Sequence, residues 1–251
     1  MSVIDRPDRT VVHRRVGRER LRVTITGEGQ PLLLIMGLGG NLEMWGPLEQ
    51  ELVPLGFQTI AFDAPGTGGS DPPAGLRRMA GLADLTAELL DGLGYDQVDA
   101  LGVSFGGAVA QELAHRHPTR VGRLVLAATT CGLGSWPGDP WATALLLSPV
   151  GSFSRARSSR LQRPPTVVGY WSLIYAATGW TSWPWLHRLT QPTLVLAGDA
   201  DALVPLANGR QLAAAIPDAR LEVIDGGDHL FLLHDAVESA KAVAGFLTTP
   251  V

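Results

Sequence analysis

Short runs of apolar residues alternate along the chain with segments whose apolar residues recur every three or four positions. The short runs are rich in Val, Ile and Leu and are bounded by turn residues, which is typical of strands buried in a parallel sheet. They predict strands at residues 22–25, 32–36, 59–62, 98–103, 124–128, 193–197 and 221–224. The periodic segments predict helices at residues 82–93, 108–115 and 237–247. This alternation predicts an α/β fold with a mostly parallel central sheet and helices on both faces.

The alternation stops between residues 131 and 189, where no parallel strand is predicted. This stretch is rich in Pro, Ser and Arg and contains six of the seven tryptophans: Trp136, Trp141, Trp171, Trp180, Trp183 and Trp185. We therefore expect a core domain made of residues 1–130 and 190–251, with residues 131–189 inserted as a separate cap. The segment that ends at Arg22 carries seven arginines, which predicts an edge strand decorated with charges.

Composition and charge argue against several classes of protein. With 251 residues, of which 45% are hydrophobic, the chain is able to bury a large core. Its net charge of −4 argues against a nucleic-acid partner. Cys131 is the single cysteine, so the chain forms no internal disulfide. The sequence shows no tight cluster of metal ligands, and we expect neither a metal nor another cofactor.

Two features of the sequence bear on targeting. The N-terminus lacks the apolar core of a signal peptide. The uncharged run from Pro164 to Leu186 is long enough to span a bilayer, but it contains three prolines and two glycines. We therefore expect no membrane span and a cytoplasmic protein, and the sequence does not indicate its oligomeric state.

The strongest motif is Gly102-Val103-Ser104-Phe105-Gly106, which matches G-x-S-x-G between a predicted strand and a predicted helix. A serine on such a sharp turn has a strained backbone and a hydroxyl lifted out of the sheet edge. Side chains two positions before and after it would collide, which explains both glycines. The free N–H groups at the start of the next helix favour a developing oxyanion. Ser104 is therefore the candidate nucleophile.

The chain resembles the α/β-hydrolase family over residues 30–130 and 191–246. The segments that carry the likeness are Met36–Gly40, Asp63–Ser70, the serine turn, Gly198–Pro205 and Asp228-His229. Within that family it looks most like the intracellular medium-chain polyhydroxyalkanoate depolymerases. Its insertion is shorter than the cap of those enzymes, and little of the insertion's sequence matches that cap. The resemblance implies the α/β-hydrolase fold with an inserted cap, and a serine hydrolase that cleaves carboxylic esters.

A serine hydroxyl needs a base to act as a nucleophile. The family order of serine, acid and histidine asks for a histidine after the last strand, and His229 follows the final predicted strand directly. The resemblance favours Asp201 as the acid, because it matches the family pattern Gly-x-x-Asp-x-x-Val-Pro, and makes Asp199 a turn residue. His187, which lies in the insertion, is a candidate to reach the substrate. The other histidines are expected in structural or solvated places: His13, His115, His117 and His234.

The remaining site residues are inferred from position. Two backbone N–H groups are the candidate oxyanion hole. One belongs to Leu38, which follows the end of a predicted strand, and the other belongs to Phe105, which follows Ser104. Aromatic residues are candidates for the lining of an apolar substrate pocket: Trp45, Phe105, Trp171 and Tyr175. Asp63, which opens a glycine-rich turn, is expected to be structural.

Several functions remain open from the sequence alone. A small-molecule or oligomeric ester is the expected substrate, and a hydroxyacid polyester or oligoester is the one that the resemblance favours. The alternatives are a small ester, lactone or thioester hydrolase, a carbon–carbon bond hydrolase, and a non-hydrolytic biosynthetic or binding protein on the same fold. Haloalkane dehalogenases and epoxide hydrolases use an aspartate nucleophile, and Ser104 in that place argues against both.

Overall fold

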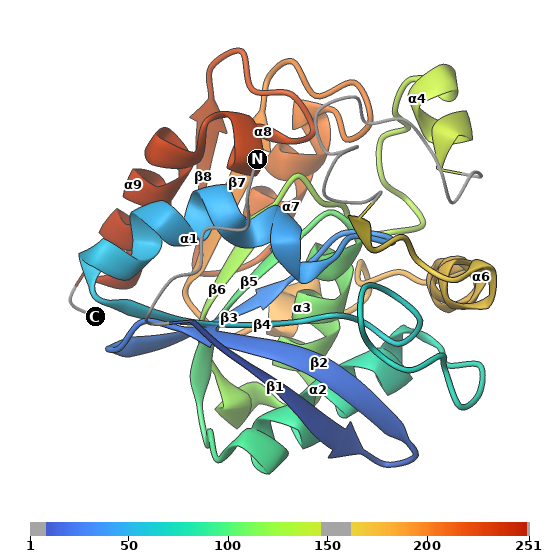
Figure 1. The fold of residues 1–251 in the computed structure, drawn as a ribbon. Coiled ribbons are helices and arrows are strands. Elements are labelled where there is room, and N and C mark those ends of the chain that lie inside the picture. The colour runs from blue at the N-terminus through green and yellow to red at the C-terminus, as the bar shows by residue number, and fades with distance from the viewer. Residues whose placement is uncertain (1–8, 147–161, 250–251) are drawn as a thin grey trace.

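A computed structural model describes residues 9–146 and 162–249 of the chain. Its centre is a sheet of eight strands in the order β1-β2-β4-β3-β5-β6-β7-β8 (Figure 1). The strands β2 and β4 pair antiparallel, as do β1 and β2, whereas every other pair is parallel. The bounds are β1 Arg9–Val16, β2 Glu19–Thr26, β3 Gln30–Ile35, β4 Phe57–Phe62, β5 Val98–Val103, β6 Val121–Ala127, β7 Thr193–Gly198 and β8 Ala219–Ile224.

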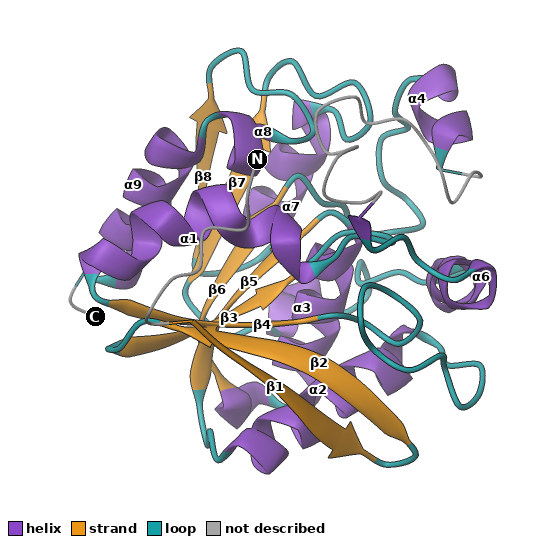
Figure 2. Ribbon diagram, in the orientation of Figure 1, coloured by secondary structure: helices purple, strands orange, loops and turns teal. Residues whose placement is uncertain are grey.

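Helices cover both faces of this sheet (Figure 2). One face packs against α2, α3 and α7, and the other against α1, α8 and α9. The α-helices are α1 Gly46–Leu52, α2 Met79–Leu93, α3 Phe105–Arg116, α4 Pro140–Leu145, α6 Val167–Ala177, α7 Leu206–Ala215, α8 Phe231–His234 and α9 Ala236–Leu247. Short 3-10 turns are η1 Leu42–Trp45, η2 Val53–Leu55, η3 Pro118–Arg120 and η4 Leu186–Arg188.

The alternation of side chains along each strand produces this layering. In β3, Leu33 and Ile35 belong to the core on the α2 and α3 side, whereas Leu32 and Leu34 belong to the opposite core. Because successive side chains point to opposite faces, a strand between two helical layers is apolar at nearly every position. The structure therefore confirms the predicted α/β fold class, with helices on both faces.

The predicted strands coincide with observed ones, with small differences at their ends. Met36 and Ala128 lie just beyond β3 and β6. Ala128 leaves the strand because its φ is 46°, in the left-handed region. The arginine-rich N-terminal segment forms β1, which lies at the edge of the sheet as predicted. It also supplies the first half of β2, which lies inside the sheet and buries Arg22, contrary to the prediction.

The segment between β6 and β7 holds α4 and α6, which lie to one side of the sheet in Figure 1. In its described part, no strand joins the sheet, and Gly132 and Thr181 form an isolated bridge. The start of α6 rests on the loop after β4, where the Thr166 N–H donates to the Gly66 carbonyl at 2.8 Å. Among the described residues, no helix has the length and apolar character needed to cross a membrane.

Candidate active site

The turn after β5 holds Ser104 with φ 54° and ψ −120°, a conformation that strains any residue other than glycine. Its N–H donates to the Ala127 carbonyl at 2.9 Å, which fixes the turn to β6. A Cβ at Gly102 would lie 2.3 Å from the Gly106 carbonyl oxygen, and one at Gly106 would lie 2.0 Å from the Ile35 carbonyl oxygen. Both glycines are therefore required, the second because α3 starts against the end of β3.

Ser104, His229 and Asp201 form a continuous chain of hydrogen bonds. His229 Nε2 lies 3.1 Å from Ser104 Oγ, and His229 Nδ1 lies 2.8 Å from Asp201 Oδ2. The Asp201 side chain is fully buried, and its other oxygen accepts the N–H groups of Leu203 and Val204 at 2.8 Å each. With one oxygen fixed by backbone amides, the other faces the imidazole and favours the tautomer with a proton on Nδ1.

Asp199 has a different task from Asp201. Its Oδ1 accepts the Gly226 N–H at 2.7 Å, so it ties the loop after β7 to the loop that carries His229. Glycine allows these loops to touch, since a Cβ at Gly198 would lie 2.1 Å from the Gly227 carbonyl oxygen. Asp199 therefore accepts a hydrogen bond from an amide 27 positions away. The sequence had suggested a bond to an amide of its own turn.

Asp228 supports the loop that carries His229, a role that the sequence analysis did not predict. Its Oδ1 accepts the Leu230 N–H at 2.8 Å. The His234 Nδ1 on α8 lies 3.0 Å from Oδ2 and 3.1 Å from Oδ1 of the same carboxylate. This brace joins the residue before His229 to the helix that follows. The signal in the sequence was a histidine six positions after an aspartate.

The histidines at the end of α3 lie in structural places. The His115 ring stacks on Trp185 at 4.2 Å between centroids, and His117 Nε2 lies 2.8 Å from Asp84 Oδ1. His187 is exposed in η4 and lines neither of the cavities described below.

Ser104 lies in the wall of a mostly apolar pocket, which we call the serine pocket. Leu38 and Trp45, both predicted from the sequence as site residues, lie in its wall. The described residues that line it are Met36, Gly37, Leu38, Gly40, Met44, Trp45, Val103, Ser104, Leu146, His229, Leu230, Leu232 and Leu233.

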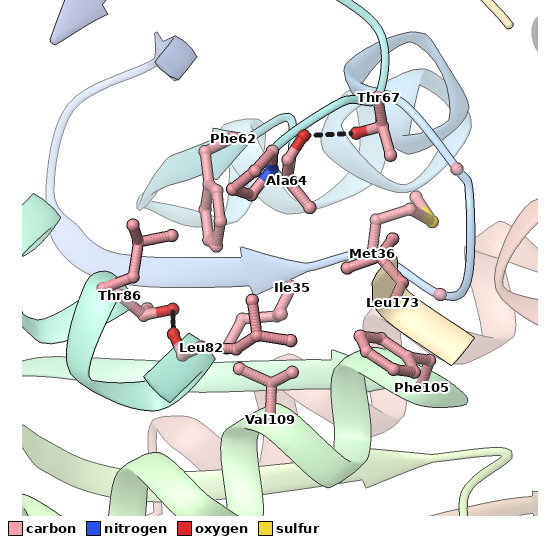
Figure 3. A pocket seen from close by; sticks show the side chains of 14 residues that line it. Ile35, Met36, Phe62, Ala64, Thr67, Leu82, Thr86, Phe105, Val109 and Leu173 are labelled. Carbon is pink, nitrogen blue, oxygen red and sulfur yellow. Dashed lines mark hydrogen bonds between the residues drawn. The ribbon is translucent and has the colours of Figure 1, made fainter. Parts of the chain in front are cut away.

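Phe105 lines a second, smaller apolar pocket, which we call the side chamber (Figure 3). It lies between the ends of β3 and β4, the helices α2 and α3, and Leu173 of α6. Its described lining is Ile35, Met36, Gly37, Gly40, Phe62, Ala64, Pro65, Thr67, Leu82, Leu85, Thr86, Phe105, Val109 and Leu173.

Two residues predicted to line the substrate pocket lie elsewhere. Trp171 and Tyr175 are 45% and 42% exposed and line neither cavity. They are four positions apart on α6 and so share its outer face, where Arg78 lies over the Tyr175 ring at 5.0 Å. The inner face of the helix carries Tyr170 and Leu173 instead, and Leu173 reaches the side chamber.

A buried charged cluster holds the loop before Trp45. Asp63 accepts the Leu42 N–H at 2.8 Å through one oxygen and Arg22 Nε at 2.7 Å through the other, which fits its expected structural role. Arg22 also pairs with Glu43 at 2.8 Å. Burial acts to raise the pKa of Glu43, but the hydrogen bonds and charge of Arg22 outweigh it and hold the pKa below its ordinary value.

Comparison with known proteins gives the family. The sequence profile described as alpha/beta hydrolase fold matches residues 30–171 and 133–236. The chain belongs to the α/β-hydrolase fold family. This membership confirms the resemblance that the motifs suggested, and it accounts for the position of the serine turn at the carboxyl edge of the sheet.

Within the α/β-hydrolase family, a curated relative from Ectopseudomonas oleovorans is a poly(3-hydroxyalkanoate) depolymerase. It is 44% identical over 239 residues, which cover 86% of this chain and 84% of the relative. A hydrolase structure from Pseudomonas aeruginosa has a TM-score of 0.82 at 27% identity, covering 98% of this chain and all of that one. The enol-lactonase from Burkholderia xenovorans LB400 has a TM-score of 0.83 at 25% identity, covering 95% of this chain and all of that one.

Proposed function

We propose that the protein is a serine hydrolase of carboxylic esters with Ser104, His229 and Asp201 as its catalytic triad. The observation that carries the proposal is the unbroken series of contacts from Asp201 Oδ2 through the imidazole to Ser104 Oγ, at 2.8 and 3.1 Å. Those contacts lie at a strained turn that opens into an apolar pocket. Strain, burial and a base within hydrogen-bond reach together are what a nucleophilic serine requires.

In the proposed mechanism, Ser104 Oγ attacks the ester carbonyl carbon while His229 Nε2 takes the hydroxyl proton. The backbone N–H groups of Leu38 and Phe105 stabilise the negative charge on the carbonyl oxygen. The tetrahedral intermediate then collapses, His229 gives its proton to the departing alkoxide, and an acyl-enzyme forms on Ser104. Water that loses a proton to His229 attacks this acyl group, the bond between the acyl carbon and Ser104 Oγ breaks, and His229 returns the proton to Oγ as the acid is released. Asp201 keeps the imidazole oriented and stabilises its positive charge.

For the substrate, we propose a hydroxyacid polyester or oligoester. The support is the likeness to the poly(3-hydroxyalkanoate) depolymerase, together with two adjoining apolar cavities. Residues 131–189 are proposed to act as the cap over this site, since Leu146 lines the serine pocket and Leu173 lines the side chamber. A small ester or lactone is the second candidate, which the likeness to the enol-lactonase favours.

Active-site labelling tests the nucleophile. A fluorophosphonate should label the folded protein at Ser104, and Ser104→Ala should remove both the label and ester turnover while leaving the circular dichroism spectrum unchanged. Ser135→Ala is the matched control, because Ser135 lines neither cavity. Labelling that survives in Ser104→Ala would reject the assignment. Product analysis with oligomers of 3-hydroxyacids, simple lactones and vinylogous diketones then separates the ester, lactone and carbon–carbon hydrolase alternatives.

A further inference from the structure

The peptide unit between Ser104 and Phe105 carries one of the two N–H groups proposed to bind the oxyanion. Phe105 is the first residue of α3, where an N–H group has no carbonyl acceptor within the helix. A peptide unit is planar and trans, so the direction of its carbonyl fixes the direction of its N–H. Rotation about Ser104 ψ, which is −120°, turns the whole unit. Whatever holds the Ser104 carbonyl therefore also aims the Phe105 N–H.

Two donors hold the Ser104 carbonyl. The Gly107 N–H donates to it at 2.9 Å, within the turn itself. Thr129 Oγ1, which belongs to the segment after β6, donates to the same oxygen at 2.7 Å. The carbonyl of Gly37, in the same peptide unit as the Leu38 N–H, likewise accepts a backbone N–H three positions on, at 3.0 Å. The turn at Ser104 thus adds a side-chain donor to its backbone bond.

The surroundings of Thr129 fix its hydroxyl against the turn. Thr129 is buried, and the chain leaves β6 just before it, at Ala128, whose φ is 46°. The Ala128 N–H donates to the Leu196 carbonyl at 3.0 Å, which holds this bend to β7. A Cβ at Gly107 would lie 2.5 Å from Thr129 Oγ1, so the glycine allows the side chain to approach α3. A β-branched side chain is stiff at χ1, so the hydroxyl is pre-organised toward the Ser104 carbonyl.

The strained backbone of Ser104 gives this hydroxyl a task. Strain favours rotation of the peptide unit out of its present orientation, and a hydrogen bond to the carbonyl opposes that rotation. The same bond polarises the peptide unit and makes the Phe105 N–H a better donor. An oxyanion is stabilised most by donors that already point to the place where its charge develops. The contact from Thr129 therefore bears on the transition state although Thr129 lines neither the serine pocket nor the side chamber.

We propose that Thr129 is a positioning residue of the oxyanion hole, whose hydroxyl holds the Ser104 carbonyl and so aims the Phe105 N–H at the oxyanion. The inference rests on the proposed ester hydrolase function and adds a residue that acts on the transition state from behind the nucleophile. Full negative charge on the substrate oxygen does not exist in the bound ester. Loss of the hydroxyl should therefore lower kcat and leave KM unchanged.

The experiment compares nitrophenyl butyrate with its thiono analogue, in which sulfur replaces the carbonyl oxygen. Sulfur is a weak hydrogen-bond acceptor, so an oxyanion donor contributes less to the reaction of the thiono ester. Thr129→Val keeps the shape of the side chain and removes the hydroxyl. We expect it to lower kcat for the oxygen ester by about 10–100-fold and to change KM by less than about twofold. The thiono ester should lose less than about threefold.

Three further variants accompany Thr129→Val. Thr129→Ala should show the same selective loss, which keeps the test open if the valine variant does not fold. Thr129→Ser restores a hydroxyl and should keep kcat for both esters within about threefold of wild type. Thr130→Val is the matched control at the next position, where the Thr130 hydroxyl accepts the Gly132 N–H at 3.0 Å within its own loop. It should also keep both rates within about threefold.

Equal losses for the two esters in the folded Thr129→Val and Thr129→Ala variants would overturn the proposal, because Thr129 would then act on the nucleophile or the fold. A raised KM at unchanged kcat, or a serine variant as slow as the valine variant, would overturn it as well.

Crystal structures of wild type and Thr129→Val separate this proposal from the proposed catalytic function. Absence of fluorophosphonate labelling and of ester turnover in the wild-type protein would reject the hydrolase function alone. In that case, or where the thiono ester reacts too slowly to be measured, the positioning role stands if the Ser104–Phe105 peptide unit has rotated in the variant. It fails if Ser104 ψ stays at −120° in both proteins.

Discussion

The backbone at Ser104 is held in a left-handed conformation that a serine adopts only where its surroundings enforce it. Gly106 contributes to this, as a Cβ there would overlap the Ile35 carbonyl oxygen. We expect Gly106→Ala to push α3 away from β3 and lower the free energy of unfolding by at least about 2 kcal/mol. It should also abolish ester turnover by moving Ser104 relative to His229. Urea unfolding and a kinetic assay measure the two effects.

Gly92 gives the matched control for this variant. It lies in α2, and no described atom beyond the adjoining helix backbone comes within 4 Å of where its Cβ would be. Gly92→Ala should raise the free energy of unfolding by about 0.5–1 kcal/mol, since alanine favours a helix. Equal stability of Gly106→Ala and Gly92→Ala would show that close packing on β3 is not the reason for a glycine at position 106.

The two aspartates after β7 are expected to differ sharply in their effect on catalysis. Asp201→Asn would present an amide to His229 Nδ1 and favour the wrong tautomer, and we expect kcat to fall by about 10³–10⁴. Asp199→Asn should lower kcat less than about tenfold, because that carboxylate accepts the Gly226 N–H and does not touch the imidazole. Steady-state kinetics at saturating ester, with matched melting temperatures, checks the ranking. The reverse order would move the acid to Asp199.

The position of a residue at the sheet edge is predictable where its motif is short and follows a strand. Ser104, Asp201 and His229 each lie in such a motif, so the parallel strands that precede them bring the three to one sheet edge. Trp171 and Tyr175 lie in no such motif. Their type suggested a substrate pocket, but the rotation of α6 about its axis turns them outward, and that rotation depends on packing against the rest of the chain.

At the scale of elements, the parallel strands are predictable because both of their faces are buried. The helix α7 is not predicted, since Asn208 and Gly209 in its first turns look like a turn sequence. Gly209 has a packing reason, as a Cβ there would lie 2.8 Å from the Cβ of Ala197 on β7. Close approach of this helix to the sheet is a tertiary constraint that a local pattern does not contain.

The loop that carries Leu38 and η1 gives a pH-dependent prediction. Because the pKa of Glu43 is lowered from its ordinary value of 4.5 in the folded protein, its pairing with Arg22 stabilises the fold above that pH. This contribution is lost as the pH falls through the lowered pKa. Glu43→Gln should therefore reduce the free energy of unfolding by about 1–2 kcal/mol at pH 7, and the difference from wild type should shrink below pH 4.5.

Urea unfolding of both proteins at a series of pH values measures this difference. Asp63, whose pKa is raised by burial despite the nearby charge of Arg22, contributes in the opposite direction in both proteins. Glu88→Gln, at an exposed position on α2, is the control and should show a constant small difference across the same range. A gap between Glu43→Gln and wild type that stays constant down to acid pH would rule out the ion pair as its source.

For the whole molecule, the sheet explains why residues far apart in the sequence meet. The strands β5, β7 and β8 are parallel to one another, so the loops that carry Ser104, Asp201 and His229 all emerge at their carboxyl ends. That much follows from the alternation of strands and helices. The packing of the insertion does not follow from that alternation. Residues 131–189 show no regular hydrophobic pattern, and their position depends on contacts with α3.

Those contacts tie the insertion to the core. Trp180 Nε1 donates to Glu112 Oε2 on α3 at 2.8 Å, and the Trp185 ring stacks on His115 of the same helix. Leu173 and Leu186 belong to the hydrophobic cluster that α2 and α3 share. A segment that contributes to the core in this way has little apolar surface of its own to fold around. We therefore expect the insertion and the core to unfold together.

Tryptophan fluorescence makes this expectation measurable, because six of the seven tryptophans lie in the insertion and Trp45 alone lies in the core. Fluorescence thus reports mainly on the insertion, whereas circular dichroism at 222 nm reports on the helices of the whole chain. In a single cooperative transition the two signals have the same urea midpoint and the same slope. An earlier fluorescence transition, with most of the dichroism retained, would show that residues 131–189 open as a unit of their own, and the cap would then be a separate domain.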